Sequence, residues 1–149
     1  MAQGTLTLFE EFSKALADGT HDMNTNVFKL ALITTIPTAA DASPALGDYT
    51  EVSGTNYTPG GETLTTTWTE AGGVCDFKHT GGTITWTQHA SGPNNIKAGI
   101  IYDTTSAVTG AAICFIDFTT DAGTTAISLI DGDITWTPEA AQNRIFTIS

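Results

Sequence analysis

The sequence predicts a mainly β protein, an antiparallel β-sandwich or barrel-like domain with one short N-terminal α-helix. Threonine and glycine are frequent, and they suit pleated, half-buried strands and tight turns respectively. Short apolar runs alternate with Gly-, Asn-, Asp- and Pro-containing turns, as in sandwiches and barrels. The length fits one domain. We therefore expect a single β domain over 1–149, with an N-terminal helix or extension (1–20), a loop or arm (37–48) and a β body (49–149).

The expected helix covers residues 7–18. Thr7 and Glu10 form a capping-box pattern, in which each side chain accepts a hydrogen bond from a free backbone N–H. Gly19 suits a left-handed C-cap. The apolar stripe of this helix needs a partner, either the sheet of its own domain or another subunit. It consists of Leu8, Phe9, Phe12, Ala15 and Leu16.

A first strand is expected over Val27–Ile36, and Pro37 ends it. The arm, residues 37–48, has two prolines and no apolar period. Long connections of this kind are often functional or variable. We expect the arm to be mobile or to become ordered on a partner.

The rest of the chain reads as short strands. Tyr49–Ser53 and the strand starting at Glu62 are expected to form a hairpin through Pro59-Gly60-Gly61, since Pro fixes one φ and Gly permits a positive φ. The further expected strands are Glu62–Glu70, Val74–His79, Thr83–His89, Ile96–Asp103, Ala111–Thr119, Thr125–Ile130, Asp133–Thr137 and Arg144–Ile148.

A short motif recurs along the chain. Ile84-Thr85-Trp86 returns as Ile134-Thr135-Trp136, with a weaker copy at Thr66-Thr67-Trp68. Alternation places Trp on one face of a strand and Thr on the other. The repeat therefore predicts three strands of one sheet with the same orientation of side chains.

The charge excludes several classes of partner. The net charge is −11, with five Lys and Arg against sixteen Asp and Glu. Nucleic-acid binding needs clustered cations, and an anionic membrane surface would repel this chain, so neither partner is expected. No apolar run is long enough to span a membrane, and the N-terminus lacks the features of a secretory signal. We expect synthesis and assembly in the cytosol.

No catalytic constellation is visible, so we predict neither an enzyme nor a cofactor. The three histidines, His21, His79 and His89, lack the spacing of a zinc site. His21 is expected in a turn after the helix, beside Asp22. His79 and His89 are expected to be surface groups that could meet across a hairpin of 74–79 and 83–89. The acidic turns at 121–123 and 131–133 lack an EF-hand pattern, so no metal site is predicted. Cys75 and Cys114 are expected to be free thiols rather than one disulfide.

Four segments of the chain form one pattern. The helix ends in Leu16-Ala17-Asp18-Gly19-Thr20, and the strand Lys29-Leu30-Ala31-Leu32 follows. The most specific part is the segment 51–61, E-V-S-G-T-N-Y-T-P-G-G, and Tyr102-Asp103 and Ile116-Asp117-Phe118 complete the set. Together these segments resemble a family of small structural proteins of tailed-bacteriophage particles. The resemblance extends from about Leu16 to Phe118 and more weakly to the end of the chain.

The resemblance implies a structural role as capsid cement or decoration, located on the capsid surface of the virion and assembled in the host cytoplasm. The implied partner is the major capsid protein, and a homo-oligomer such as a trimer would fit a local three-fold axis of a capsid. The alternatives are a tail or neck component, or a carbohydrate-binding module that uses Trp68, Trp86 and Trp136. The helix and the arm supply the predicted partner-binding residues Leu8, Phe9, Phe12, Leu16, Pro37, Pro44 and Leu46.

Overall fold

The computed structural model describes residues 4–105, 110–139 and 141–149, so residues 1–3 of the expected N-terminal extension lie outside it. The fold is mainly β with antiparallel sheets and one short helix, which confirms the predicted fold class. The elements in chain order are β1 (Leu6–Leu8), α1 (Phe12–Ala17), β2 (Phe28–Ile33), the 3-10 helix η1 (Leu46–Asp48), β3 (Glu62–Thr63), β4 (Thr66–Ala71), β5 (Val74–His79), β6 (Ile84–Trp86), β7 (Ala98–Asp103), β8 (Ala112–Asp117), β9 (Ile134–Trp136) and β10 (Arg144–Ile148).

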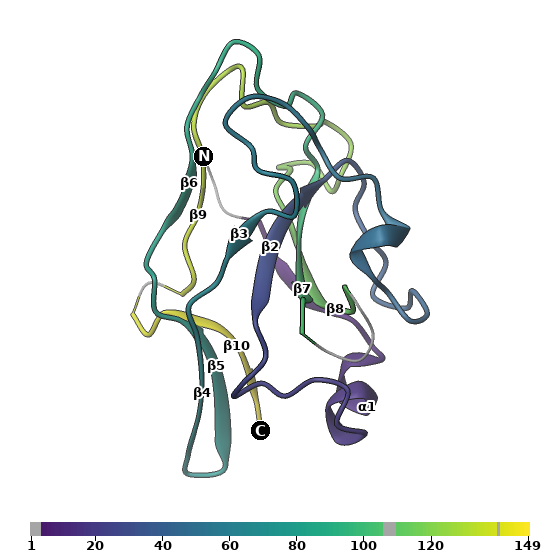
Figure 1. The fold of residues 1–149 in the computed structure, drawn as a ribbon, viewed down its shortest axis with the longest axis vertical. Coiled ribbons are helices and arrows are strands. Elements are labelled where there is room, and N and C mark those ends of the chain that lie inside the picture. The colour runs from purple at the N-terminus through teal and green to yellow at the C-terminus, as the bar shows by residue number, and fades with distance from the viewer. Residues whose placement is uncertain (1–3, 106–109, 140) are drawn as a thin grey trace.

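Three sheets make up the body (Figure 1). The main sheet has the strand order β1-β8-β7-β2-β3, a second sheet has the order β10-β5-β4, and β6 pairs with β9 alone. Phe28, Leu30 and Leu32 on β2 face one apolar cluster, which also holds Phe77 of β5 and Trp136 of β9. The smaller sheets therefore pack on one face of the main sheet, as the layers of a sandwich do.

The arm covers the opposite face of the main sheet (Figure 1). Ala31, Ile33 and Ile100 face a second cluster, against which Ile36, Leu46 and Tyr49 pack. Burial on both faces explains the nearly continuous apolar sequences of β2, β7 and β8. The arm is thus a layer packed on the protein's own sheet, and its mobility or ordering on a partner stays a prediction.

The N-terminal prediction was wrong in part, because the helix begins later than expected. Leu6–Leu8 is a strand that pairs antiparallel with β8, with Thr7 opposite Phe115. α1 starts at Phe12 and has no side-chain cap at Glu11, so the capping box of Thr7 and Glu10 is not formed. The edge of β8 offers backbone hydrogen bonds to residues 6–8, and this tertiary pairing overrides local helix preference.

The predicted hairpin around Pro59-Gly60-Gly61 is also wrong, since its two arms do not pair with each other. Glu51 bridges Ile33, and β3 pairs with Lys29 and Leu30. Both segments therefore lie along the same edge of β2, and residues 52–61 form a loop between them. The N–H of Leu32, which faces this loop, donates to the hydroxyl of Tyr57 at 3.0 Å instead of to a strand.

The motif at 51–61 holds that loop in place. The Tyr57 hydroxyl donates to Oε1 of Glu51 at 2.5 Å, and the N–H of Gly60 donates to the same oxygen at 2.6 Å. Tyr102 of β7 donates to the carbonyl of Gly60 at 2.7 Å. Burial, and then the hydrogen bond to Glu51, raise the pKa of Tyr57, so its hydroxyl keeps the proton that it donates. The loop therefore occupies the edge of the main sheet beside β2, and side-chain hydrogen bonds hold it there in place of the backbone pairing of a strand.

The recurring Ile-Thr-Trp motif does not mark three strands of one sheet. Two copies pair with each other, since Ile84 lies opposite Trp136 and Trp86 opposite Ile134. The third copy belongs to β4, which pairs with β5 in a different sheet. Thr and Trp do alternate between the two faces, since Trp86 and Trp136 are buried while Thr85 is exposed. The repeat therefore predicts which face of a strand each side chain occupies, but it does not predict that the three strands belong to one sheet.

His79 is a buried core residue and not the surface group that was expected. Its Nδ1 accepts a hydrogen bond from the N–H of Thr65 at 3.0 Å, and its ring stacks on Trp136. His89 is exposed, and its Nδ1 accepts from the N–H of Ser91. β5 pairs with β4 and β10, so the expected hairpin between 74–79 and 83–89, which would have brought the two histidines together, is absent.

We expect this burial to make folding stability fall as the pH drops below about 6.5. Desolvation lowers the pKa of His79 below its ordinary value of 6.5. The unfolded chain then takes up a proton before the folded chain does, which favours unfolding. Urea midpoints at pH 7.5 and 5.5 measure the effect. His79→Gln should reduce the change in midpoint and the control His89→Gln should retain it; equal changes in the two variants would contradict the assignment.

Candidate binding pocket between helix α1 and the arm

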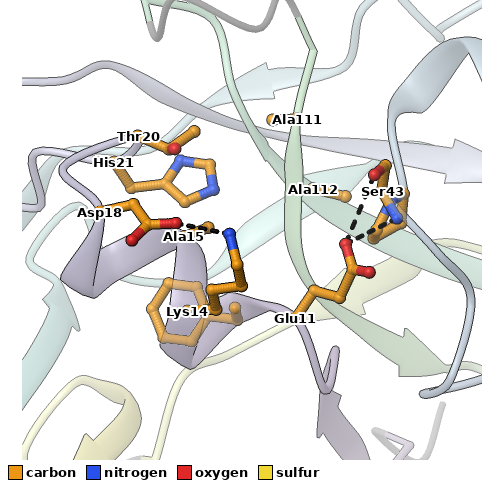
Figure 2. A pocket seen from close by; sticks show the side chains of 11 residues that line it. Glu11, Lys14, Ala15, Asp18, Thr20, His21, Ser43, Ala111 and Ala112 are labelled. Carbon is orange, nitrogen blue, oxygen red and sulfur yellow. Dashed lines mark hydrogen bonds and ion pairs between the residues drawn. The ribbon is translucent and has the colours of Figure 1, made fainter.

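A pocket of about 190 Å³ lies where α1, the arm and β8 meet. This volume is below the roughly 300–1,000 Å³ of pockets that hold drug-sized ligands, so the pocket has room for a small group. Figure 2 shows it with Glu11 and Ser43 on one side and His21 and Asp18 on the other. The lining residues are Glu11, Phe12, Lys14, Ala15 and Asp18 at α1, Thr20 and His21 after it, Ser43 and Pro44 in the arm, and Ala111 and Ala112 at β8.

Backbone and side-chain hydrogen bonds fix the walls of the pocket. The N–H of Ala112 donates to the carbonyl of Pro44 at 2.8 Å, so the arm is joined to the start of β8. The N–H of Ser43 donates to Oε2 of Glu11 at 2.8 Å and joins the arm to α1. Because three separate segments are connected in this way, the pocket is a formed part of the fold.

A buried, hydrogen-bonded pair of side chains lies at the base of the pocket. Nδ1 of His21 is 2.9 Å from Oδ2 of Asp103, and the His21 and Asp103 side chains are 2 % and 0 % exposed. The same oxygen accepts from Nδ2 of Asn26, while Oδ1 accepts from the backbone N–H and the hydroxyl of Thr105. An ionised carboxylate only accepts hydrogen bonds. Nδ1 of His21 is therefore the donor of this pair.

The charged groups at the rim are exposed. Lys14 forms an ion pair with Asp18 at 2.5 Å, one helical turn apart. This hydrogen bond, with the nearby charge of Asp18, raises the pKa of Lys14. Exposed pairs of this type contribute little to stability. The Lys14 side chain is therefore held only weakly over the pocket.

The structure brings only part of the predicted partner-binding set to the pocket. Phe12 and Pro44 line it, but both are buried. Phe9 contacts Phe115 on the far face of the main sheet. Of the remaining residues, Pro37 is buried, while Leu8, Leu16 and Leu46 are half-buried. The apolar stripe expected on the N-terminal segment thus mostly contacts the chain's own core, so it does not form an exposed docking face here.

Sequence reasoning missed the polar residues of the pocket. His21 and Asp103 are 82 positions apart, and no local pattern joins them. The only local signal was the pair Tyr102-Asp103, where a carboxylate ends a strand that is otherwise apolar. A buried charge needs a partner, so that position could have been marked as one that requires a donor from elsewhere.

Other candidate sites have structural explanations. Asp121 accepts hydrogen bonds from Thr125 within its own turn, which lowers its pKa. Within the described ranges, no group of three or more His, Cys, Asp or Glu side chains is arranged to hold a metal ion. Cys75 and Cys114 are free thiols, as predicted, and burial raises the pKa of Cys114.

The three tryptophans do not form a platform for a sugar. Trp86 and Trp136 are 2 % and 1 % exposed, and only Trp68 is partly accessible. The carbohydrate-binding alternative needed exposed indole faces on one surface, and this geometry does not supply them. In the part of the chain that is described, no helix is long and apolar enough to cross a membrane.

Comparisons with protein-family models, with curated proteins and with solved structures gave no match for this chain.

Proposed function

We propose that this protein is a structural component of a tailed-bacteriophage particle and that it acts as a capsid cement or decoration protein. The proposal rests on the family-like motif at 51–61. Glu51, Tyr57 and Gly60 of that motif are joined by hydrogen bonds in one loop. The residues that carry the resemblance therefore also hold this part of the fold together. Such residues support a relationship to the family better than a similar amino-acid composition would.

The proposed partner is the major capsid protein, bound on the capsid surface after assembly in the host cytoplasm. A net charge of −11 would complement basic patches on a shell protein and would speed correct association. A sandwich with both faces of its main sheet covered is a rigid body that can bridge neighbours without refolding. A homo-oligomer, such as a trimer, belongs to the same proposal.

We expect the purified protein to co-sediment with capsids that lack it and to raise the temperature at which those capsids disassemble. Because the attraction is electrostatic, binding should weaken as NaCl rises from 50 to 500 mM. Electron cryomicroscopy of the particle should then show density on the outer shell, between capsomers. Density confined to the tail or neck would contradict the cement role.

A tail or neck component is the second candidate, and the outer edge of β4 favours it. β4 is at the end of the order β10-β5-β4, and most of its residues are exposed. Open strand edges can pair with another chain. This candidate predicts rings or tubes of the purified protein in electron micrographs, whereas the cement proposal predicts small uniform oligomers.

A further inference from the structure

The pocket between α1 and the arm is lined by a buried histidine, one of whose ring nitrogens has no hydrogen bond to the described residues. His21 is 4 % exposed and lines the pocket, into which its ring points in Figure 2. Nδ1 donates to Asp103, which leaves Nε2 with no hydrogen bond to the described residues. In a neutral imidazole whose Nδ1 carries the proton, Nε2 is an acceptor. The base of the pocket therefore presents an acceptor to whatever enters it.

A second acceptor, the carboxylate of Glu11, lines the same pocket. Glu11 uses Oε2 for the backbone N–H of Ser43, at 2.8 Å, and for its hydroxyl, at 3.4 Å. Oε1 of Glu11 has no hydrogen bond within the ranges that the structure describes. Figure 2 shows the carboxylate of Glu11 and the ring of His21 on opposite sides of the pocket.

The charges around the pocket favour a cation. The ionisable side chains that line it are Glu11, Lys14, Asp18 and His21, with Asp103 behind His21. The three carboxylates of Glu11, Asp18 and Asp103 outnumber the one group here that always carries a positive charge. Lys14 is the cation, and its ion pair with Asp18 is exposed. A stronger cationic ligand could therefore displace the ammonium group of Lys14 from the mouth of the pocket.

We propose that this pocket binds the guanidinium group of an arginine side chain from a partner protein. A guanidinium group is planar and carries five N–H donors that point in several directions, so it offers donors for both the Glu11 carboxylate and Nε2 of His21. An ammonium group is a compact point charge without this planar arrangement. Lys14 then acts as an internal competitor for the pocket. The inference does not rest on the proposed virion role, because it follows from the pocket alone.

The test uses the full chain and N-acetyl-arginine amide as the probe, with ring ¹H–¹⁵N signals of the histidines as the readout. The His21 signals should shift in a saturable way, with a dissociation constant on the order of 1 mM, as expected for one side chain. N-acetyl-lysine amide should bind at least several-fold more weakly. Equal binding of the two probes, or the absence of a saturable shift of His21, would overturn the proposal.

Variants of Glu11 and Lys14 test their two proposed roles, Glu11 as an acceptor for the ligand and Lys14 as its competitor. Glu11→Gln should weaken binding of the arginine probe about tenfold, because it removes the charge of one acceptor. Lys14→Ala should strengthen binding several-fold, because it removes the competitor. The control Glu10→Gln changes an exposed neighbour that does not line the pocket and should leave binding unchanged. If Glu10→Gln and Glu11→Gln weakened probe binding equally, the loss would come from the change in net charge, and the proposed binding site at Glu11 would be refuted.

Discussion

Replacing Asp103 by Ala is expected to lower the free energy of unfolding by about 3–5 kcal/mol, because each buried donor left without an acceptor costs about 1–3 kcal/mol. The substitution leaves Nδ1 of His21, Nδ2 of Asn26 and the N–H of Thr105 without their acceptor. Domains of this size are stable by about 5–15 kcal/mol, so the loss is a large part of the total. Urea denaturation measures it as a lower midpoint with an unchanged slope.

Asp22→Ala is a matched control for this experiment. Asp22 adjoins His21 in sequence, but it is exposed, and its carboxylate accepts hydrogen bonds from Asn24 and Thr25 in its own turn. Its loss should cost no more than about 1 kcal/mol. Asp103→Asn, which keeps the size of the side chain, should fall between the two and remains measurable if Asp103→Ala does not fold. A similar loss in Asp22→Ala and Asp103→Ala would refute the structural role assigned to the buried pair.

The second large effect is expected at Gly61, where Ala should destabilise the fold by about 2–5 kcal/mol. Gly61 has φ +74°, and a Cβ there would lie 2.0 Å from the carbonyl oxygen of Leu30 and 2.6 Å from Cα of Ala31. Left-handed backbone costs a non-glycine residue roughly 1–2 kcal/mol, and forcing extra volume into a packed site costs about 1–3 kcal/mol more. The clash is with the backbone of β2, which no side-chain rotation relieves.

Gly60→Ala is the control that separates the cost of a left-handed backbone from the cost of a steric clash with β2. Gly60 has φ +87°, yet a Cβ there would meet only Tyr102 Oη at 3.4 Å and Lys29 Nζ at 3.7 Å. This control should lose only the roughly 1–2 kcal/mol of backbone strain. Thermal unfolding can resolve the two variants, because 1 kcal/mol shifts the Tm of a chain of this size by about 2–4 °C. If both variants melted together, the close approach of Gly61 to β2 would be refuted.

Local chemistry predicted the elements whose hydrogen bonds are local. β5 has the predicted bounds, and Gly72-Gly73 forms the predicted turn between β4 and β5 because both residues adopt a positive φ. β10 also has the predicted bounds, although its partner β5 is distant in the sequence. The sequence did not predict the pairing partners of segments that lie next to strands distant in the chain. Residues 6–8 pair with β8, and Glu51 and β3 both lie along β2. Turn residues show where the chain bends, but they do not show which strand it meets.

The pocket could not be predicted in the same way. Its acceptors come from α1 and from the segment after it, and Asp103, which orients His21, comes from the end of β7. Each position has an ordinary local explanation, since Glu11 can be a surface residue and His21 a turn residue. Only the antiparallel arrangement of β2, β7 and β8 brings Asp103 beneath His21. Sites that join distant segments through single side chains leave little trace in sequence patterns.

The placement of the three indole rings gives the protein an intrinsic optical probe. Trp86 and Trp136 are enclosed in the core, and among the described residues their ring N–H groups have no acceptor, so both emit from apolar surroundings. Trp68 on β4 is only partly buried, and a dissolved quencher such as iodide reaches that ring first. The quenchable part of the emission therefore reports on one strand at the edge of one sheet. A partner that covers β4 protects this signal, and no dye has to be attached to detect it.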